Sequence, residues 1–109
     1  MKPLPPTLRE RNRYLSFKVE GGKPFKDEDV GKAVWFNCLR ILGEAGLSGT
    51  GLRVIEFDAK KQMGILKVNH KSVDKTRASL ALIKEVDREP AAFHTIRVSG
   101  TVKKARESK

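Results

Sequence analysis

Apolar residues along this chain recur with two different periods, which mark alternating strands and helices. Between residues 13 and 19 every second side chain is apolar, the pattern of a strand with one buried face. From Asp27 to about Ala45 the period changes to three or four residues, which predicts a helix that Gly46 ends. The acidic residues at 27–29 favour the start of that helix. Its predicted inner stripe is Val30, Val34, Cys38, Ile41 and Ala45, with Leu42 beside it.

The second half of the chain continues with strand, strand, helix and strand patterns. Residues 52–58 and 64–70 predict a hairpin whose turn lies at 59–62. Val54 and Ile55 are apolar neighbours, so the pattern leaves the register of the first hairpin strand undecided. Residues 72 to about 86 predict a helix with Ser72 as its N-cap, and residues 93–102 predict the last strand. The inward residues are expected to be Val73, Thr76, Leu80 and Ile83 on the helix, then Ile96 and Val98 on the strand.

The predicted order of elements is β-α-β-β-α-β. This order is typical of the α+β ferredoxin-like sandwich, in which two helices cover one face of an antiparallel sheet. We therefore expect a basic extended arm at 1–12, where three prolines disfavour a helix, a single domain at 13–102 and a basic tail at 103–109. The other sheet face is expected to be open and to carry Tyr14, Ser16, Lys18, Lys67, Asn69, Thr95 and Arg97.

The chain is strongly basic, and this changes what the open face is expected to bind. Its 109 residues include 23 Lys and Arg against 13 Asp and Glu, for a formal net charge of +10. Such an excess favours a polyanionic partner such as RNA, whose phosphates the cations would contact. For any single residue, a merely solvated charge explains the sequence as well. The candidate RNA-binding residues are Arg9, Arg11, Arg13, Lys18, Lys67, Lys71, Arg97, Lys103 and Lys104.

Aromatic residues are too few for an extended base-stacking surface. An RNA-recognition motif stacks bases on aromatic side chains of its two central strands. Here the third strand has no aromatic residue, and the first offers only Tyr14 to the open face. The sequence therefore favours recognition of the backbone and shape of folded RNA.

Acidic residues, a cysteine and histidines are present, but their spacing in the sequence does not predict that they cluster into a catalytic site. Glu56 and Asp58 point the same way from one strand, but no further acidic cluster joins them as a two-metal nuclease requires. Cys38 is the only cysteine and lies on an apolar helix face, which favours a role in the core. The positions of His70 and His94 in the sequence do not match the spacing of any known pair of catalytic nucleophile and base. His70 is either a candidate phosphate contact or simply a polar residue at the end of a strand. We expect no catalytic residue, metal ion or cofactor on the protein.

Two further observations narrow the function. Acylphosphatases share this order of elements but need an arginine beyond their phosphate loop, and the loop at 21–26 has none, so that likeness stops at topology.

The longest apolar run is too short for a bilayer, no signal-peptide pattern is visible, and one cysteine suits a reducing compartment. A cytoplasmic protein without membrane contact is expected.

A helical wheel places Phe36 almost opposite the inner stripe of the first helix, with Leu39 also well off it. An apolar spot on a charged face indicates a protein partner. A scattered surface residue or a wider buried stripe explains the pattern equally well, so both interpretations stay open.

Several segments, taken in order, resemble one protein family. They read LPPTLRE at 4–10, RYLSF at 13–17, LGEAG at 42–46, VIEFD at 54–58, GILKV at 64–68, RASLALI at 77–83 and VSGTVKK at 98–104. Together they are similar to the archaeal ribonuclease P protein component 2 family, which is shared with the eukaryotic RNase P and RNase MRP particles.

The resemblance implies a subunit of the ribonucleoprotein that cleaves the 5′ leader from precursor tRNA. In such a particle the RNA holds the catalytic Mg²⁺ ions, and the protein binds and stabilises that RNA. The implied partners are RNase P RNA, an RNase P protein with a TIM-barrel-like fold, and a second copy of the chain within a heterotetramer. No C-terminal helix is expected after Thr101. A general RNA-binding or ribosome-associated domain of the same fold is the alternative.

Overall fold

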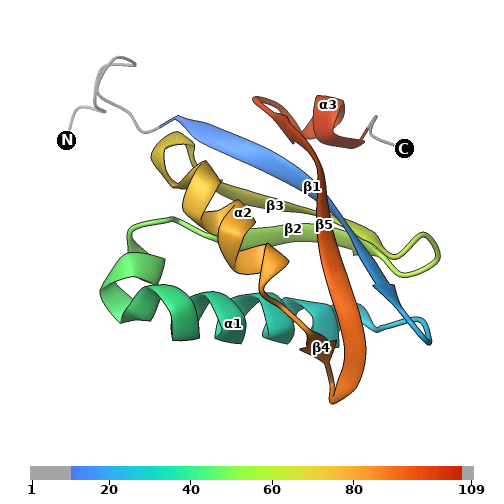
Figure 1. Cartoon of the computed structure of the whole chain (residues 1–109). Coiled ribbons are helices and arrows are strands. Elements are labelled where there is room, and N and C mark those ends of the chain that lie inside the picture. Colours follow the sequence, from blue (N-terminus) through green and yellow to red (C-terminus); the bar gives the residue numbers. More distant parts are fainter. Residues whose placement is uncertain (1–10, 107–109) are drawn as a thin grey trace.

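A curled antiparallel sheet with helices packed on it forms this chain, as seen in a computed structural model that describes residues 11–106. Helices α1 and α2 cover one face of the sheet (Figure 1). The strand order within residues 11–106 is β2-β3-β1-β5-β4. The elements are β1 (Asn12–Gly21), α1 (Asp27–Ser48), β2 (Arg53–Asp58), β3 (Met63–Asn69), α2 (Val73–Ala81), β4 (Glu85–Val86), β5 (Glu89–Ser99) and α3 (Val102–Arg106).

The ferredoxin-like fold class is confirmed, and strand β1 lies at its centre between β3 and β5. The predicted alternation in β1 is also confirmed, because Leu15, Phe17 and Val19 are buried against the helices. The ring of Phe17 lies between those of Phe57 and Phe93, with ring centroids 6.3 and 5.7 Å away. This aromatic group forms the middle of the core.

A β-bulge in β2 resolves the undecided register of the hairpin. Val54 pairs with Leu66 and Glu56 pairs with Ile65, so Ile55 is the extra residue between them. The bulge lets Val54 and Phe57 both pack against the core although they are three residues apart. Ile55 remains partly exposed, which explains why two adjacent residues of this strand are apolar.

The first helix is longer than expected and contains a kink. Gly43 has a positive φ of 73°, a backbone conformation that glycine adopts without steric cost. Ile41 already lies outside the buried stripe before the kink and is exposed, and beyond the kink Leu47 is buried whereas Ala45 is exposed. The prediction that Ile41 and Ala45 belong to the inner stripe was therefore wrong. The helix continues past Gly46 to Ser48.

The second helix ends at Ala81, five residues before the predicted end. Residues 85–86 instead form the short strand β4, which pairs with the start of β5. Asp87 and Arg88 both have positive φ, which is the requirement of a tight hairpin turn with two central residues. Ser72 occupies the N-cap position of α2 as expected, but it makes no side-chain capping bond and also ends a 3₁₀ turn over His70–Ser72.

A second bulge shifts the register of β5 against β1. Ser16 pairs with Arg97, but Phe17 pairs with Thr95, so Ile96 is the extra residue. Thr95 therefore lies on the helix side of the sheet with Phe17, which corrects its predicted place on the open face. Ile96 and Val98 are 40% and 36% exposed, so neither belongs to the buried core.

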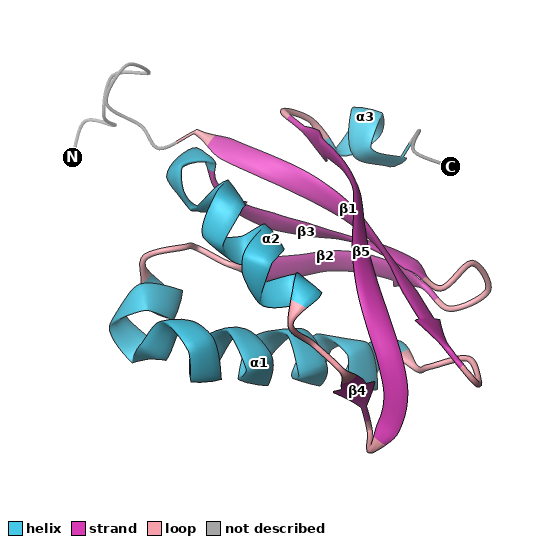
Figure 2. Cartoon of the chain, viewed as in Figure 1, coloured by secondary structure: helices cyan, strands magenta, loops and turns pink. Residues whose placement is uncertain are grey.

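The second sheet face, expected to be open, is crossed by the short helix α3 (Figure 2). The hydroxyl oxygen of Thr101 caps this helix by accepting the backbone N–H of Lys104 at 3.2 Å. Ala105 is buried on the sheet, and Ser16 beneath is only 2% exposed. The expectation of no C-terminal helix was wrong, because a five-residue helix with one buried side chain leaves no periodic pattern in the sequence.

Candidate nucleic-acid interface

Side chains on the second face of the sheet form three rows that run across the strands. Residues paired across antiparallel strands point to the same face, so the register assigns each side chain to a row. The Arg53 row contains Arg53, Lys67, Tyr14 and Ser99, in order from β2 to β5. The Ser16 row contains Glu56, Ile65, Ser16 and Arg97. The Lys18 row contains Asp58, Met63, Lys18 and His94.

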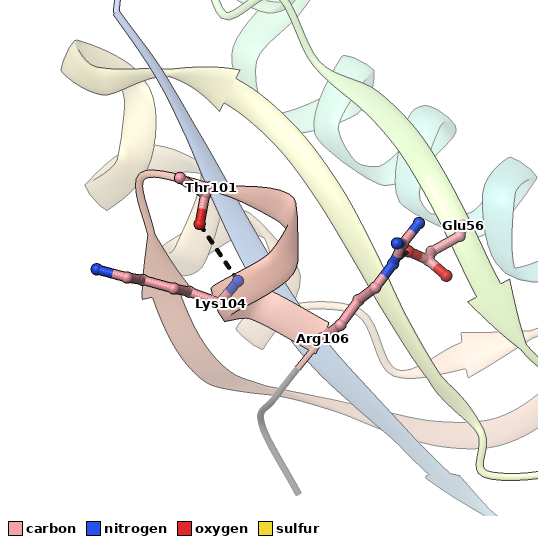
Figure 3. A network of polar contacts seen from close by, with 4 residues as sticks. All are labelled: Glu56, Thr101, Lys104 and Arg106. Carbon is pink, nitrogen blue, oxygen red and sulfur yellow. Dashed lines mark hydrogen bonds and ion pairs between the residues drawn. The ribbon is translucent and has the colours of Figure 1, made fainter.

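Helix α3 lies over the Ser16 row. Ser16 and Ile65 are both buried, and the last residue of the helix reaches β2. The Nε of Arg106 donates to Oε1 of Glu56 at 2.6 Å. Figure 3 shows Arg106 and Glu56 side by side, with the side chain of Lys104 pointing away from them. Both partners of this ion pair are well exposed, so it contributes less than about 1 kcal/mol to stability.

A shallow pocket of about 240 Å³ remains between α3 and the β2–β3 hairpin. Its walls include Glu56 and Asp58, the two carboxylates considered for metal binding. Glu56 accepts from Arg106, and Oδ1 of Asp58 accepts the backbone N–H groups of Lys60 and Lys61 in the hairpin turn. Within residues 11–106 no three His, Cys, Asp or Glu side chains gather as a metal site. The two carboxylates therefore have structural partners.

Five of the predicted RNA-binding cations lie on the α3 side of the sheet. Lys67, Arg97 and Lys18 belong to the three rows, one to each. Lys103 and Lys104 lie on α3 itself and are exposed. The structure thus brings these five cations to one face, as the sequence predicted.

Three of the remaining predicted cations, Arg11, Arg13 and Lys71, lie elsewhere. Arg13 pairs with Val68 in the register of the helix side, and its Nη1 donates to the carbonyl of Asn12 at 3.0 Å. Lys71 lies in the 3₁₀ turn before α2, and the carbonyl of Arg11 accepts the backbone N–H of His70 at 2.7 Å. These residues form a separate group at one end of the sheet. Arg9 lies outside the described residues.

Two residues were misplaced or missed by the sequence interpretation. Asn69 was assigned to the open face but is buried, and its Nδ2 donates to the carbonyl of Gly49 at 2.6 Å. Arg53 was not considered, yet it is exposed and lies directly opposite Lys67 on the α3 side. The signal for Arg53 was its positive charge at the start of a strand, but its face could not be assigned while the register was undecided.

An apolar groove lies on the helix side of the molecule, between α1 and the segment after α2. Phe36, Ile41 and Leu82 line it and are 63%, 39% and 51% exposed, and its volume is about 600 Å³. Phe36 is therefore exposed as expected. Leu39 is instead half-buried and packs against the core, so it does not share the surface of Phe36.

The only cysteine is a core residue in this fold. Cys38 is 1% exposed on the inner face of α1. Burial raises the pKa of its thiol to about 11, and a hydrogen bond with Ser79 opposes that shift in part. The thiol is therefore protonated at neutral pH and is a poor nucleophile. Among residues 11–106, no helix is both long and apolar enough to pass through a membrane.

Comparison with known proteins assigns the chain to a family. The model of the Rpp14/Pop5 family matches residues 13–108, which is most of the chain. The chain belongs to the Rpp14/Pop5 family. This assignment confirms the resemblance seen in the sequence segments.

Relatives of this family member include archaeal proteins called Ribonuclease P protein component 2. The protein from Thermococcus kodakarensis is 43% identical over 103 residues, which cover 94% of this chain and 86% of the relative. The protein from Pyrococcus furiosus is 37% identical with the same coverage. The protein from Methanosarcina mazei is 38% identical and covers 98% of this chain and 90% of the relative.

A solved structure shares the fold of this Rpp14/Pop5 family member. One chain in the cryo-EM structure of yeast Ribonuclease MRP superposes with a TM-score of 0.69. The match covers 85% of this chain and 76% of the yeast chain, at 14% sequence identity. At this identity the likeness supports the fold alone.

Proposed function

We propose that this chain is a protein subunit of ribonuclease P, the ribonucleoprotein that removes the 5′ leader from precursor tRNA. The observation that carries the proposal is the likeness to Ribonuclease P protein component 2 over nearly the whole chain, at up to 43% identity. The formal net charge of +10 and the five cations on the α3 side agree with an RNA partner. A subunit of this endoribonuclease needs no catalytic group of its own.

In this proposal the RNA and its Mg²⁺ ions carry out the hydrolysis, and the protein binds and stabilises the RNA in the cytoplasm. The structure supports this division in two ways. Glu56 and Asp58 are engaged in an ion pair and a turn, and the thiol of Cys38 is buried and protonated. In this proposal the protein therefore contributes positively charged side chains and a surface that fits the RNA, and it binds no cofactor.

The proposal also includes protein partners within the particle. The groove at Phe36 and Leu82 is an exposed apolar surface on the helix side, and apolar surfaces of this kind favour protein contacts. We assign it to the TIM-barrel-like subunit of ribonuclease P. A second copy of the chain would complete a heterotetramer.

The test is a reconstituted particle from which this chain is omitted. We expect precursor-tRNA cleavage at low magnesium concentration to fall, with recovery as magnesium rises, because added cations replace part of the missing phosphate neutralisation. Equal activity with and without the chain across the magnesium titration would contradict the proposal.

A tagged chain recovered from cells separates this proposal from a general RNA-binding role. We expect ribonuclease P RNA and the TIM-barrel-like subunit to co-purify with it. Recovery of ribosomal particles in their place would contradict the assignment.

A further inference from the structure

The rows on the two sides of α3 differ in how their charges are neutralised. Beside the Lys18 row, a carboxylate oxygen of Glu20 lies 3.9 Å from Nζ of Lys18 and another lies 3.4 Å from Nε2 of His94. Asp58 adds a further negative charge to that row. Anions therefore gain little from approaching the Lys18 row.

The Arg53 row holds two cations and no carboxylate. Arg53 and Lys67 lie directly opposite each other on β2 and β3, which places their Cβ atoms about 5 Å apart on the same face. Neither takes part in an ion pair among residues 11–106. Like charges at directly opposite positions destabilise a sheet, and a bound anion would relieve that repulsion.

An aromatic ring lies next to this pair of cations. Tyr14 is the neighbour of Lys67 on the other side, in β1, and is partly exposed. Figure 1 shows β2, β3 and β1 side by side. Strands spaced about 4.8 Å apart place the three side chains within about 10 Å. This is the scale of a single nucleotide with its phosphate.

We propose that Arg53, Lys67 and Tyr14 form a binding site for one unpaired nucleotide of RNA, whose phosphate contacts the two cations and whose base stacks on the tyrosine ring. The inference rests on the proposed function only in taking RNA as the polymer. Stacking on Tyr14 requires a free base face, which a base inside a duplex lacks, so the site selects loops and bulges of folded RNA. A stacked base of any identity fits, because every base has a π-face.

The single tyrosine of the chain makes this site directly observable. In the full-length protein with labelled tyrosine, the ring resonances of Tyr14 are followed by NMR during titration with a ten-nucleotide oligouridine RNA. We expect an upfield ring-current shift with this single-stranded probe and a much smaller shift with an RNA duplex of the same length. Unmoved Tyr14 resonances at saturation with the single-stranded probe would overturn the site.

Variants of the three residues separate the phosphate contact from the stacking. Arg53→Gln with Lys67→Gln should weaken oligouridine binding and lower its salt-dependence slope by about 1.4, since each contact to a single strand contributes about 0.7. Tyr14→Leu should weaken binding about tenfold without changing the slope, whereas Tyr14→Phe should retain affinity. Loss of affinity in Tyr14→Phe equal to that in Tyr14→Leu would refute stacking.

A matched control removes two charges elsewhere. Lys26 and Lys32 are exposed at the start of α1, so Lys26→Gln with Lys32→Gln removes the same net charge. An equal drop in slope for this control would show a general charge effect and overturn the site. Displacement of the RNA by polyglutamate at equal charge concentration would do the same. If omission of the chain lowers particle activity but Tyr14 does not respond to RNA, this inference fails and the proposed function stands.

Discussion

The two faces of the sheet are covered in contrasting ways. On the helix side, α1 and α2 bury a continuous core around Phe17 and leave an apolar groove at Phe36. On the other side, the five-residue helix α3 buries one alanine over the Ser16 row, and most side chains of the two flanking rows are polar or charged. The difference shows that burial on the helix side provides most of the stability of the fold. The other face is mainly a charged surface, whose side chains are positioned by the strands that the core holds in place.

The strongest way to break this comparison is a cavity on the helix side. Phe17→Ala removes a fully buried ring that stacks on both Phe57 and Phe93. We expect the free energy of unfolding to fall by about 3–5 kcal/mol, measured by urea denaturation followed by circular dichroism. A loss of less than about 1 kcal/mol would show that the core does not depend on this aromatic group.

The corresponding change on the other face should cost much less. Ala105→Asp places a carboxylate where a methyl group is buried, so α3 should detach and lower the free energy of unfolding by about 1–2 kcal/mol. Arg106→Gln, which removes only the exposed ion pair to Glu56, is the control and should cost less than about 0.5 kcal/mol. A larger effect from Arg106→Gln than from Ala105→Asp would mean that the ion pair, not burial, holds α3.

The smallest effect on stability is expected in the groove. Phe36→Asp changes a 63% exposed side chain, so the free energy of unfolding should shift by at most about 0.5 kcal/mol. Affinity for the TIM-barrel-like subunit should fall at least about tenfold, measured by calorimetry, with RNA affinity retained. Leu39→Ala provides the contrast, because a half-buried residue should affect stability more than partner binding. If Phe36→Asp lost affinity for RNA but still bound the protein subunit with unchanged affinity, the assigned role of the groove would be refuted.

The periodic parts of the sequence predicted the fold well. The alternation in β1 and the early stripe of α1, from Val30 to Cys38, both lie where the pattern placed them. The bulges at Ile55 and Ile96 did not follow from the pattern, because each adds one residue and reverses the alternation beyond it. Strand β4 after α2 was missed because its turn into β5 uses two non-glycine residues with positive φ, so no glycine marks it in the sequence.

The candidate interface was predicted in part for the same reason. Lys18 and Lys67 were placed correctly because their strands keep a regular period beside the core. Arg53 was missed because it precedes a bulge in a segment that is apolar on both sides. The cover over Ser16 was missed because it depends on a tertiary contact of Ala105.

The buried Cys38 gives this molecule a natural reporter of its own motions. A thiol reagent cannot reach a side chain that is 1% exposed until α1 moves away from the sheet. Because it is the only cysteine, the rate of its modification in the native protein measures the free energy of that opening without any introduced probe. Bound RNA on the sheet face and a bound protein in the groove should slow the reaction to different extents, so a single thiol can reveal which surface is coupled to the core.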